Sequence, residues 1–262
     1  MANVFFALTE EFNASEVVAL LASGQAVVFY RIALMSKDGD WVLRETAAAC
    51  GHVRSVLARR GASYRPGAPL EARWLAGGWS SHFEFFDERR RRIRCDFVSR
   101  PPRIAHDDLD AMFAAARGEG ALRVVDPERL ILLKRTQRAK DYPVIGELSR
   151  LLPAPGELES TTDPDRILEL AGTFGRESAR ESVRAARLGL PRAEVVAALA
   201  GEIDRMQRED RRRMKGYELA AEAYLREFRS AGLADAPLEE AHRIALGLAE
   251  ALLPDEPLRE TR

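Results

Sequence analysis

Cysteine and histidine are scarce in this 262-residue sequence, which limits the metal and disulfide chemistry it can carry. There are two cysteines, Cys50 and Cys95, and four scattered histidines: His52, His82, His106 and His242. No spacing among them matches a zinc site, and two cysteines do not suggest a disulfide framework. We therefore expect neither a zinc protein nor a disulfide-held fold.

Long apolar segments and a strong charge imbalance are also missing. No stretch approaches membrane-spanning length. The N-terminus has no basic flank and only a short apolar run over residues 4–8, so no signal peptide is expected and the expected compartment is the cytoplasm. The net charge is −1. This balance argues against a protein wrapped in nucleic acid, although it allows a local basic groove.

The residues that are present favour a folded, globular chain. Hydrophobic residues make up 46% of the sequence and charged residues 31%, so a substantial core can be buried. A linker is predicted where Pro153, Pro155 and Gly156 precede a Ser-Thr-Thr run at residues 160–162, and the later segments have helical patterns. We expect two domains, residues 1–155 and residues 156–262, the second an all-α helical bundle.

Two aspartates, Asp38 and Asp40, stand directly before an apolar run at residues 41–43. This pattern predicts the start of a β-strand, on which both carboxylates point to the same face. Two carboxylates on one face repel each other unless a cation lies between them, and a divalent metal prefers oxygen ligands. The alternative is a solvated turn over residues 37–40, where aspartate is an ordinary turn residue.

A third aspartate, Asp96, lies on a later predicted strand. Three segments read as strands of an antiparallel meander that follows a loop at residues 62–70: residues 70–75, 80–86 and 92–98. In the last of them Ile93, Cys95 and Phe97 share one face, and Asp96 lies on the other face with Arg94. Aspartate is depleted in strands, which makes Asp96 a candidate ligand. The alternative is a solvent-facing aspartate paired with an arginine.

A small-residue pair, Ser23 and Gly24, precedes a mostly apolar segment that is predicted to be a helix over residues 25–34. The free backbone N–H groups at the start of such a helix can bind a phosphate, although most Ser-Gly pairs are plain turns. Residues 3–22 fit either a short helix or a buried strand, and periodicity does not decide between the two.

Two cations lie on a later predicted helix. Asp126 and Pro127 are typical of a helix start, and the helix is expected to run to about residue 140. Lys134 and Arg138 then stand at i and i+4, where like charges repel mildly unless an anion bridges them. The alternative is two surface cations near acids such as Asp141.

Two basic clusters are further candidates for phosphate contact. One is the run of four arginines at residues 89–92, in a predicted hairpin turn. The other is Arg211, Arg212, Arg213 and Lys215 on a long predicted helix, preceded by Glu209 and Asp210. Charge runs are usually solvated surfaces, so each cluster is a hypothesis.

In this order the motifs resemble the nucleotidyltransferase superfamily, the polymerase-β-like fold, and more closely its bacterial branch of stand-alone transferases and abortive-infection toxins, the AbiEii-like group. That family carries a small-residue pair before a helix, then D-x-D on a strand, then a third aspartate on a later strand. Ser23-Gly24, Asp38-x-Asp40 and Asp96 match those motifs, and Lys134, Arg138 and Lys140-Asp141 resemble the basic helix of the branch. Gly39 departs from the family, which usually has a bulky aliphatic residue between the aspartates.

The resemblance implies an α+β fold, with a nucleotidyltransferase-like mixed sheet flanked by helices over about residues 16–152. It implies transfer of a nucleoside monophosphate from an NTP to an RNA (such as tRNA), a protein or a small-molecule hydroxyl. Asp38, Asp40 and Asp96 would be both catalytic residues and ligands of Mg²⁺ or Mn²⁺. Ser23, Gly24, Lys134 and Arg138 would bind the nucleotide. A role in a toxin–antitoxin or phage-defence system, with a cognate toxin or antitoxin as partner, is also implied. The alternative is a catalytically silent member of the fold that serves as an antitoxin or scaffold.

Overall fold

The computed structural model describes residues 3–104 and 108–258. Contacts along the chain group into two compact units, one of residues 1–126 with 215–262 and the other of residues 127–214. The boundary expected between residues 155 and 156 lies inside the second unit, and it stays a prediction of where an independently folding domain would end.

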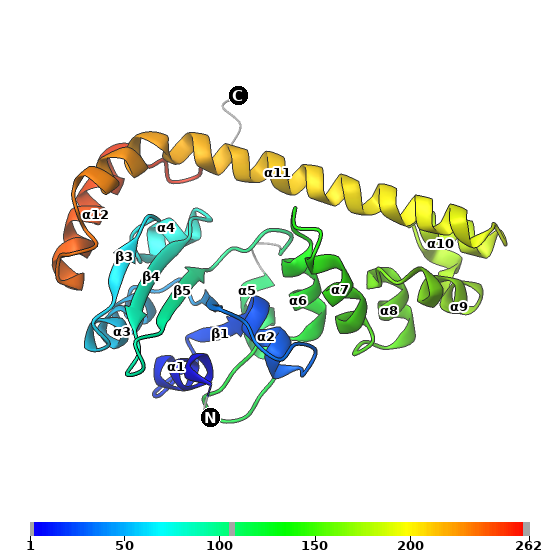
Figure 1. Ribbon diagram of the computed structural model, residues 1–262, viewed down its shortest axis with the longest axis horizontal. Helices are drawn as coiled ribbons and strands as arrows, with labels where there is room; N and C mark the ends of the chain where they lie inside the picture. Colours follow the sequence, from blue (N-terminus) through cyan, green and yellow to red (C-terminus); the bar gives the residue numbers. More distant parts are fainter. Residues whose placement is uncertain (1–2, 105–107, 259–262) are drawn as a thin grey trace. The chain divides into compact units, whose positions relative to one another are not determined.

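The first unit is built around one five-stranded mixed sheet with the strand order β1-β2-β5-β4-β3 (Figure 1). The strands are β1 (Ala19–Ala22), β2 (Asp38–Leu43), β3 (Ser63–Arg65), β4 (Ser81–Phe86) and β5 (Arg92–Val98). β2 and β5 run parallel, and the other neighbouring pairs are antiparallel. The expectation of a strand beginning at the D-x-D motif is confirmed.

Helices flank this sheet. The helices of the first unit are α1 (Val4–Phe12), α2 (Ser23–Phe29), α3 (Ala47–Arg59), α4 (Ala72–Ala76), α5 (Leu109–Ala114) and α12 (Leu238–Leu252). One sheet face buries Trp41, whose ring stacks on Phe97 at 5.3 Å and meets the edge of Phe12 from α1. The Trp41 Nε1–H donates to Thr9 Oγ1 of the same helix at 2.9 Å. An aromatic cluster therefore fixes α1 on the face opposite the one that carries Asp38 and Asp40.

Side chains alternate along β5 as expected. Ile93, Cys95 and Phe97 are buried, whereas Arg94 and Asp96 are half-buried on the other face. The period of two that the sequence predicted for this strand is confirmed.

Two expectations in the first unit are wrong. Residues 70–75 do not form a strand, because Leu70, Trp74 and Leu75 are buried at a helical spacing and α4 forms there. The predicted loop at residues 62–70 contains β3, whose Tyr64 is buried against Phe83 with ring centroids 4.4 Å apart. Burying the Tyr64 ring stabilises the strand by more than the turn preference of the following residues disfavours it.

The helix predicted over residues 25–34 is shorter than expected. α2 begins at Ser23 and ends at Phe29, and Arg31 adopts a left-handed φ of 61° that closes the helix end. Leu34, expected inside the helix, lies in the following loop and is fully exposed.

The second unit is entirely helical in the part of the chain that the structure describes. Its helices are α6 (Pro127–Lys134), α7 (Asp141–Ser149), α8 (Ala154–Ser160), α9 (Pro164–Phe174), the 3₁₀ turn η2 (Gly175–Glu177), α10 (Glu181–Arg187) and the first part of α11 (Arg192–Ser230). Their core contains Leu158, Ile167, Leu170, Ala171, Val183, Ala185, Val195 and Leu199. The linker expected at residues 153–162 is wrong in its central part, because α8 forms there and contributes Leu158 to this core.

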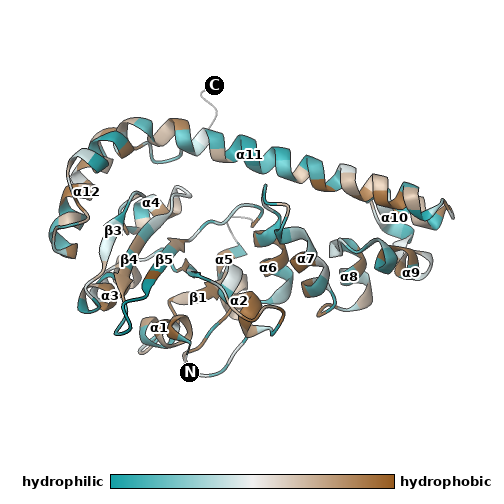
Figure 2. Cartoon of the chain, viewed as in Figure 1, coloured by the Kyte–Doolittle hydropathy of each residue, from teal (hydrophilic) through white to brown (hydrophobic). Residues whose placement is uncertain are grey.

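α11 is a single helix of 39 residues, and Figure 2 shows a hydrophilic run in its middle. Its residues up to 214 belong to the second unit and the rest to the first. The chain is thus an α+β protein in which a mixed sheet with flanking helices is followed by a helical region. Among the described residues, no helix combines the length and apolar character needed to cross a bilayer.

Candidate active site

One face of the sheet carries a row of polar side chains that crosses four strands. The register pairs Asp40 of β2 with Asp96 of β5, Asp96 with His82 of β4, and His82 with Arg65 of β3. Residues paired by register stand side by side on the same face. Asp40 and Asp96, 56 positions apart in the sequence, are therefore neighbours across the parallel pair.

Within this row Asp96 is held from the side of β4 and β3. Its Oδ1 accepts a hydrogen bond from His82 Nδ1 at 2.7 Å and another from Arg65 Nη1 at 3.0 Å. A carboxylate only accepts, so the His82 proton lies on Nδ1, and Nε2 is left to face Ser80 Oγ at 2.9 Å. This chain of contacts fixes the orientation of the Asp96 side chain.

A second polar row lies two residues away along the strands, on the same face. Here the register pairs Asp38 with Arg94 and Arg94 with Glu84. Arg94 lies 3.9 Å from the Asp38 carboxylate and 3.8 Å from the Glu84 carboxylate, and Arg65 lies 3.6 Å from Glu84. Because these ion pairs are long and partly exposed, they leave the carboxylates open to a competing cation.

The three predicted ligands thus share one sheet face, as the strand phase required. They are not clustered as a metal site, however: within the described residues, no three histidine, cysteine, aspartate or glutamate side chains are grouped so that they could hold a metal ion. Mg²⁺ usually takes one or two protein carboxylates together with substrate phosphates. Asp40 and Asp96 are paired by the register, with Asp38 one row away on the same face, so they offer carboxylates for that kind of site, and the metal assignment stays a prediction.

Ser23 and Gly24 lie beside this face, at the start of α2. β1 ends at Ala22, which the register pairs with Asp40, so the chain enters α2 next to that aspartate. Ser23 has a left-handed φ of 47°, a strained conformation for a non-glycine residue and one that clusters at functional sites. A Cβ on Gly24 would lie 2.2 Å from Ser36 Oγ and 2.9 Å from Ser36 Cβ, so any larger residue would force Ser36 to move. Whether the pair binds a nucleotide stays a prediction.

Gly39, the departure from the family pattern, has a packing explanation. A Cβ at this position would lie 2.4 Å from the Trp41 ring and 2.5 Å from the Phe5 ring. The aromatic cluster under β2 therefore fills the space that a bulky aliphatic residue would occupy, and the carboxylates on the opposite face keep their places.

The predicted cation pair, Lys134 and Arg138, lies in the second unit and is arranged differently from the expectation. α6 ends at Lys134, so Arg138 stands in the turn before α7 and not on the same helix. Lys134 Nζ lies 3.4 Å from Asp141 Oδ1, and Arg138 Nε donates to Oδ2 at 2.8 Å. Because Asp141 is buried between them, their mutual repulsion is relieved without a phosphate. Nucleotide binding by this pair stays a prediction.

Three residues of the polar face were not singled out from the sequence: Arg65, His82 and Glu84. His82 and Glu84 are two residues apart on a predicted strand, so their shared face could have been inferred. Arg65 could not, because the strand that carries it was expected to be loop. Of the remaining histidines, His106 lies outside the described residues.

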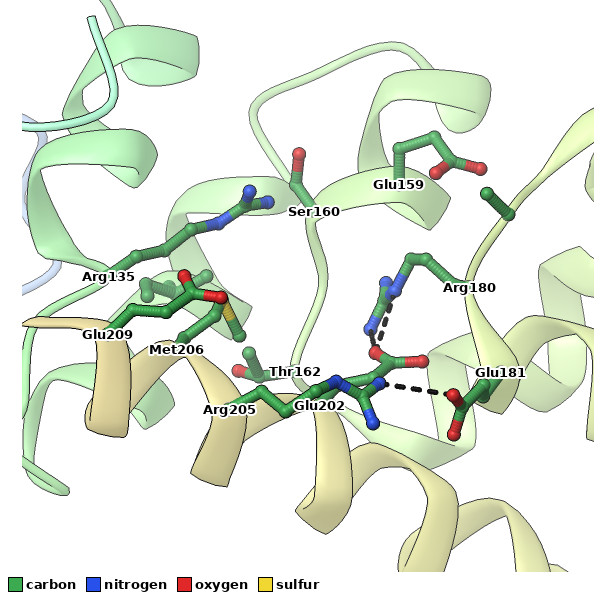
Figure 3. Close-up of a pocket in the computed structure, with 12 residues that line it drawn as sticks. Arg135, Glu159, Ser160, Thr162, Arg180, Glu181, Glu202, Arg205, Met206 and Glu209 are labelled. Atoms are coloured by element: carbon green, nitrogen blue, oxygen red, sulfur yellow. Dashed lines mark hydrogen bonds and ion pairs between the residues drawn. The ribbon is translucent and has the colours of Figure 1, made fainter.

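The second unit contains a cavity of about 380 Å³, lined by residues of α7, α8, α10 and α11 and by neighbouring loops (Figure 3). Its most buried charges neutralise each other: Arg180 Nη2 lies 2.9 Å from Glu202 Oε2, and Glu202 Oε1 also accepts the Ser182 N–H. At its rim Arg205 lies 3.3 Å from Glu181. These pairs join the helices of the unit, and none of the residues predicted to form a site lines this cavity.

The basic cluster on α11 is also paired with acids. Arg213 Nη2 lies 3.1 Å from the buried carboxylate of Asp210, and Arg211 lies 4.0 Å from Asp204. Asp210 accepts the Gln137 N–H as well, which fixes the turn after α6. These contacts support the interpretation of the cluster as a solvated helix surface.

Comparison with protein families and with curated proteins gives no match. Solved structures similar to this chain include a candidate nucleotidyltransferase from H. pylori, with 12% identity and a TM-score of 0.41, covering 79% of this chain and 94% of that one. They also include JHP933 from Helicobacter pylori, with the same identity and TM-score, covering 80% of this chain and 92% of that one. At this TM-score the likeness does not by itself assign an activity to the chain.

Proposed function

We propose that the protein is a metal-dependent nucleotidyltransferase, which moves a nucleoside monophosphate from an NTP to an acceptor hydroxyl. The observation that carries the proposal is the strand register, which pairs Asp40 with Asp96 and leaves Asp38 on the same face. Carboxylates are the ligands that Mg²⁺ or Mn²⁺ takes at phosphoryl-transfer sites, and the motifs in the sequence point to the same chemistry.

In this proposal Asp38 and Asp40 would hold the divalent cation with the NTP phosphates, and Asp96 would be a further metal ligand beside the acceptor hydroxyl. The bound cation would neutralise charge that develops on the phosphate oxygens. The acceptor oxygen bonds to the α-phosphorus while the bond to pyrophosphate breaks, and the hydroxyl proton passes to Asp96. His82 and Arg65 would act as positioning residues, because both hold the Asp96 carboxylate.

The phosphates of the NTP would be bound by Ser23 and the amide of Gly24 at the start of α2. Nucleotide binding by Lys134 and Arg138 is part of the proposal too: within the second unit the pair would bind a phosphate in competition with Asp141. The acceptor would be an RNA such as tRNA, a protein or a small molecule, and membership of the AbiEii-like branch, with a toxin–antitoxin or phage-defence role, is part of the same proposal.

One observation favours a second function, a catalytically silent binding protein such as an antitoxin or scaffold. Asp96 already accepts from both His82 and Arg65, and such pairing satisfies its charge without a metal. In a silent protein these contacts would be structural, and no NTP would be turned over.

Labelled transfer separates the two functions. The protein is incubated with each α-labelled NTP, Mg²⁺ and either total tRNA or cell lysate, beside Asp96→Asn and a control, Asp110→Asn, whose carboxylate is 91% exposed on α5. We expect label in one acceptor fraction with the wild type and the control, and a loss of at least about a hundredfold in Asp96→Asn. No label with any NTP would support the silent protein, and equal labelling by Asp96→Asn would refute the catalytic role of Asp96.

A further inference from the structure

A second cavity, of about 280 Å³, opens where β2 and β5 begin, at the end of the polar face that carries Asp38. Its lining includes Lys37, Asp38, Arg91, Arg92 and Arg94, with Phe5 on the apolar side. Four of these six side chains are cationic. The run of arginines in the β4–β5 turn, which the proposed transfer chemistry does not use, thus contributes two of them to one cavity.

The cations in this cavity are not all neutralised. Arg91 lies 2.7 Å from Asp87, but in the part of the chain that the structure describes neither Lys37 nor Arg92 has an ion pair, and both are exposed. Arg94 Nε is buried, and although Glu84 Oε2 lies 3.8 Å away, it has no hydrogen-bond partner among the described residues. A buried donor without a partner is costly, and an anion in the cavity would satisfy it.

Two exposed apolar side chains directly precede the loop residues that line this cavity. Leu34 is fully exposed and Met35 is 77% exposed, and both precede Ser36 and Lys37 in one loop. Exposed cations beside exposed apolar side chains match a ligand that has both a charged backbone and flat apolar faces. A free triphosphate would use the cations and leave Leu34 and Met35 without a role.

We propose that this cavity binds a backbone phosphate of a single-stranded nucleic acid, through Lys37, Arg92 and Arg94, while a neighbouring base lies on Leu34 and Met35. The cavity includes Asp38, so a strand held there lies at the edge of the proposed catalytic face. The assignment of that strand as the acceptor rests on the proposed function. The binding site itself does not.

Binding is measured without NTP or metal, so that its result is independent of catalysis. Fluorescence anisotropy with a short labelled single-stranded RNA, and with DNA of the same sequence, is recorded over a series of salt concentrations. The variants are Lys37→Gln/Arg92→Gln and Leu34→Ser/Met35→Ser. The control, Arg229→Gln/Arg243→Gln, removes the same charge from exposed positions of α11 and α12. Thermal melts verify that each variant is folded.

We expect the wild type to bind, and Lys37→Gln/Arg92→Gln to lose roughly tenfold in affinity with a salt slope lower by about 0.7, since the one phosphate held in the cavity contributes about 0.7 on a single strand. Leu34→Ser/Met35→Ser should lose affinity with an unchanged slope, and the control should match the wild type. Equal RNA and DNA binding identifies a backbone site, and stronger RNA binding adds contact with the 2′-hydroxyl.

Three results would overturn the proposal. In the first, the wild type binds neither RNA nor DNA. In the second, the control loses as much affinity as Lys37→Gln/Arg92→Gln, which would mean that binding depends only on the net charge of the protein. In the third, Lys37→Gln/Arg92→Gln keeps its RNA affinity but loses affinity for NTP in a separate titration, which would make the cavity a triphosphate site. A protein that binds RNA as expected yet transfers no label would refute the proposed function and leave this site standing.

Discussion

At the scale of single residues, Gly39 links the buried and the polar faces of the sheet. Its neighbours Asp38 and Asp40 point to the polar face, while the position of its missing Cβ is filled by the Trp41 and Phe5 rings. Trp41 is fully buried and Phe5 nearly so, so neither ring can move aside easily. A side chain at residue 39 would therefore displace β2 and with it both aspartates.

We predict that Gly39→Ala lowers the free energy of unfolding by about 1–3 kcal/mol through overpacking. Gly51→Ala is the matched control: it lies in α3 with open space around a Cβ, and should raise stability by about 0.5–1 kcal/mol through helix propensity. Urea unfolding of both variants measures the two changes. A Gly39→Ala protein as stable as the wild type would mean that the ring cluster is not packed as described.

The sequence predicted part of the candidate site at this scale. Strand periodicity correctly placed Asp38 and Asp40 on one face of β2, and Asp96 on the face of β5 opposite the one that buries Cys95. Alternation could be predicted because it is a local property of the chain. The pairing of Asp40 with Asp96, and the contacts of Asp96 with His82 and Arg65, depend on strand order and register. Those are set by long-range packing, which no local pattern encodes.

At the scale of elements, a polar cluster fixes α12 against α3 and β3. His242 of α12 is buried; its Nδ1 lies 2.7 Å from Tyr64 Oη and its Nε2 lies 3.0 Å from Glu71 Oε1. Arg54 of α3 contacts His242 Nε2, Glu71 and Glu239. Burial, followed by the charge of Arg54, lowers the pKa of His242 below its ordinary value of 6.5, although Glu71 and Glu239 oppose the shift.

This cluster predicts a pH dependence. Because the pKa of His242 is lower in the folded protein, the unfolded chain takes up a proton more readily. The contribution to stability is full above about pH 6.5 and is lost as the pH falls through the lowered pKa. We expect the free energy of unfolding to fall with a slope of up to about 1.4 kcal/mol per pH unit from this group.

Denaturant unfolding at a series of pH values isolates the effect when the wild type is compared with two variants. His242→Gln should flatten the dependence below about pH 6.5. His52→Gln, which removes a histidine of α3 that contacts the Glu11 carbonyl outside the cluster, should leave it as in the wild type. Parallel curves for the wild type and His242→Gln would contradict the cluster as the source.

Element lengths were harder to predict than element types. α2 and α6 are both shorter than their apolar patterns suggested, because each ends in side-chain and backbone contacts made elsewhere: the left-handed Arg31 after α2, and the bonds of Thr136 and Gln137 to Asp141 and Asp210 after α6. α4 was mistaken for a strand because a segment of six residues is too short for periodicity to separate the two.

At the scale of the whole molecule, the α+β class that the family resemblance implied is confirmed by the mixed sheet and the helical region that follows it. The grouping of the helices could not be predicted from the sequence. Proline and glycine at residues 153–156 were interpreted as a linker, yet α8 begins there and is packed into a core. The end of α11 and α12 belong with the sheet and not with the helices that precede them. Composition marks breaks in elements and does not say which elements pack together.

The central claim is that the carboxylates of Asp38, Asp40 and Asp96 form a site for a divalent cation with an NTP. Thermal unfolding of the wild type and of Asp40→Asn, with and without Mg²⁺ and each NTP, tests it most directly, because Asn keeps the shape of the side chain and deletes one charge. Without metal, Asp40→Asn should unfold at the temperature of the wild type or above it, since one of three like charges on the same sheet face is removed. The corresponding gain in the free energy of unfolding is on the order of 1 kcal/mol. With Mg²⁺ and the preferred NTP at about a hundred times its Kd, the wild type should gain about 2.7 kcal/mol and the variant far less. A destabilised Asp40→Asn together with a wild type that responds to no NTP would contradict the account.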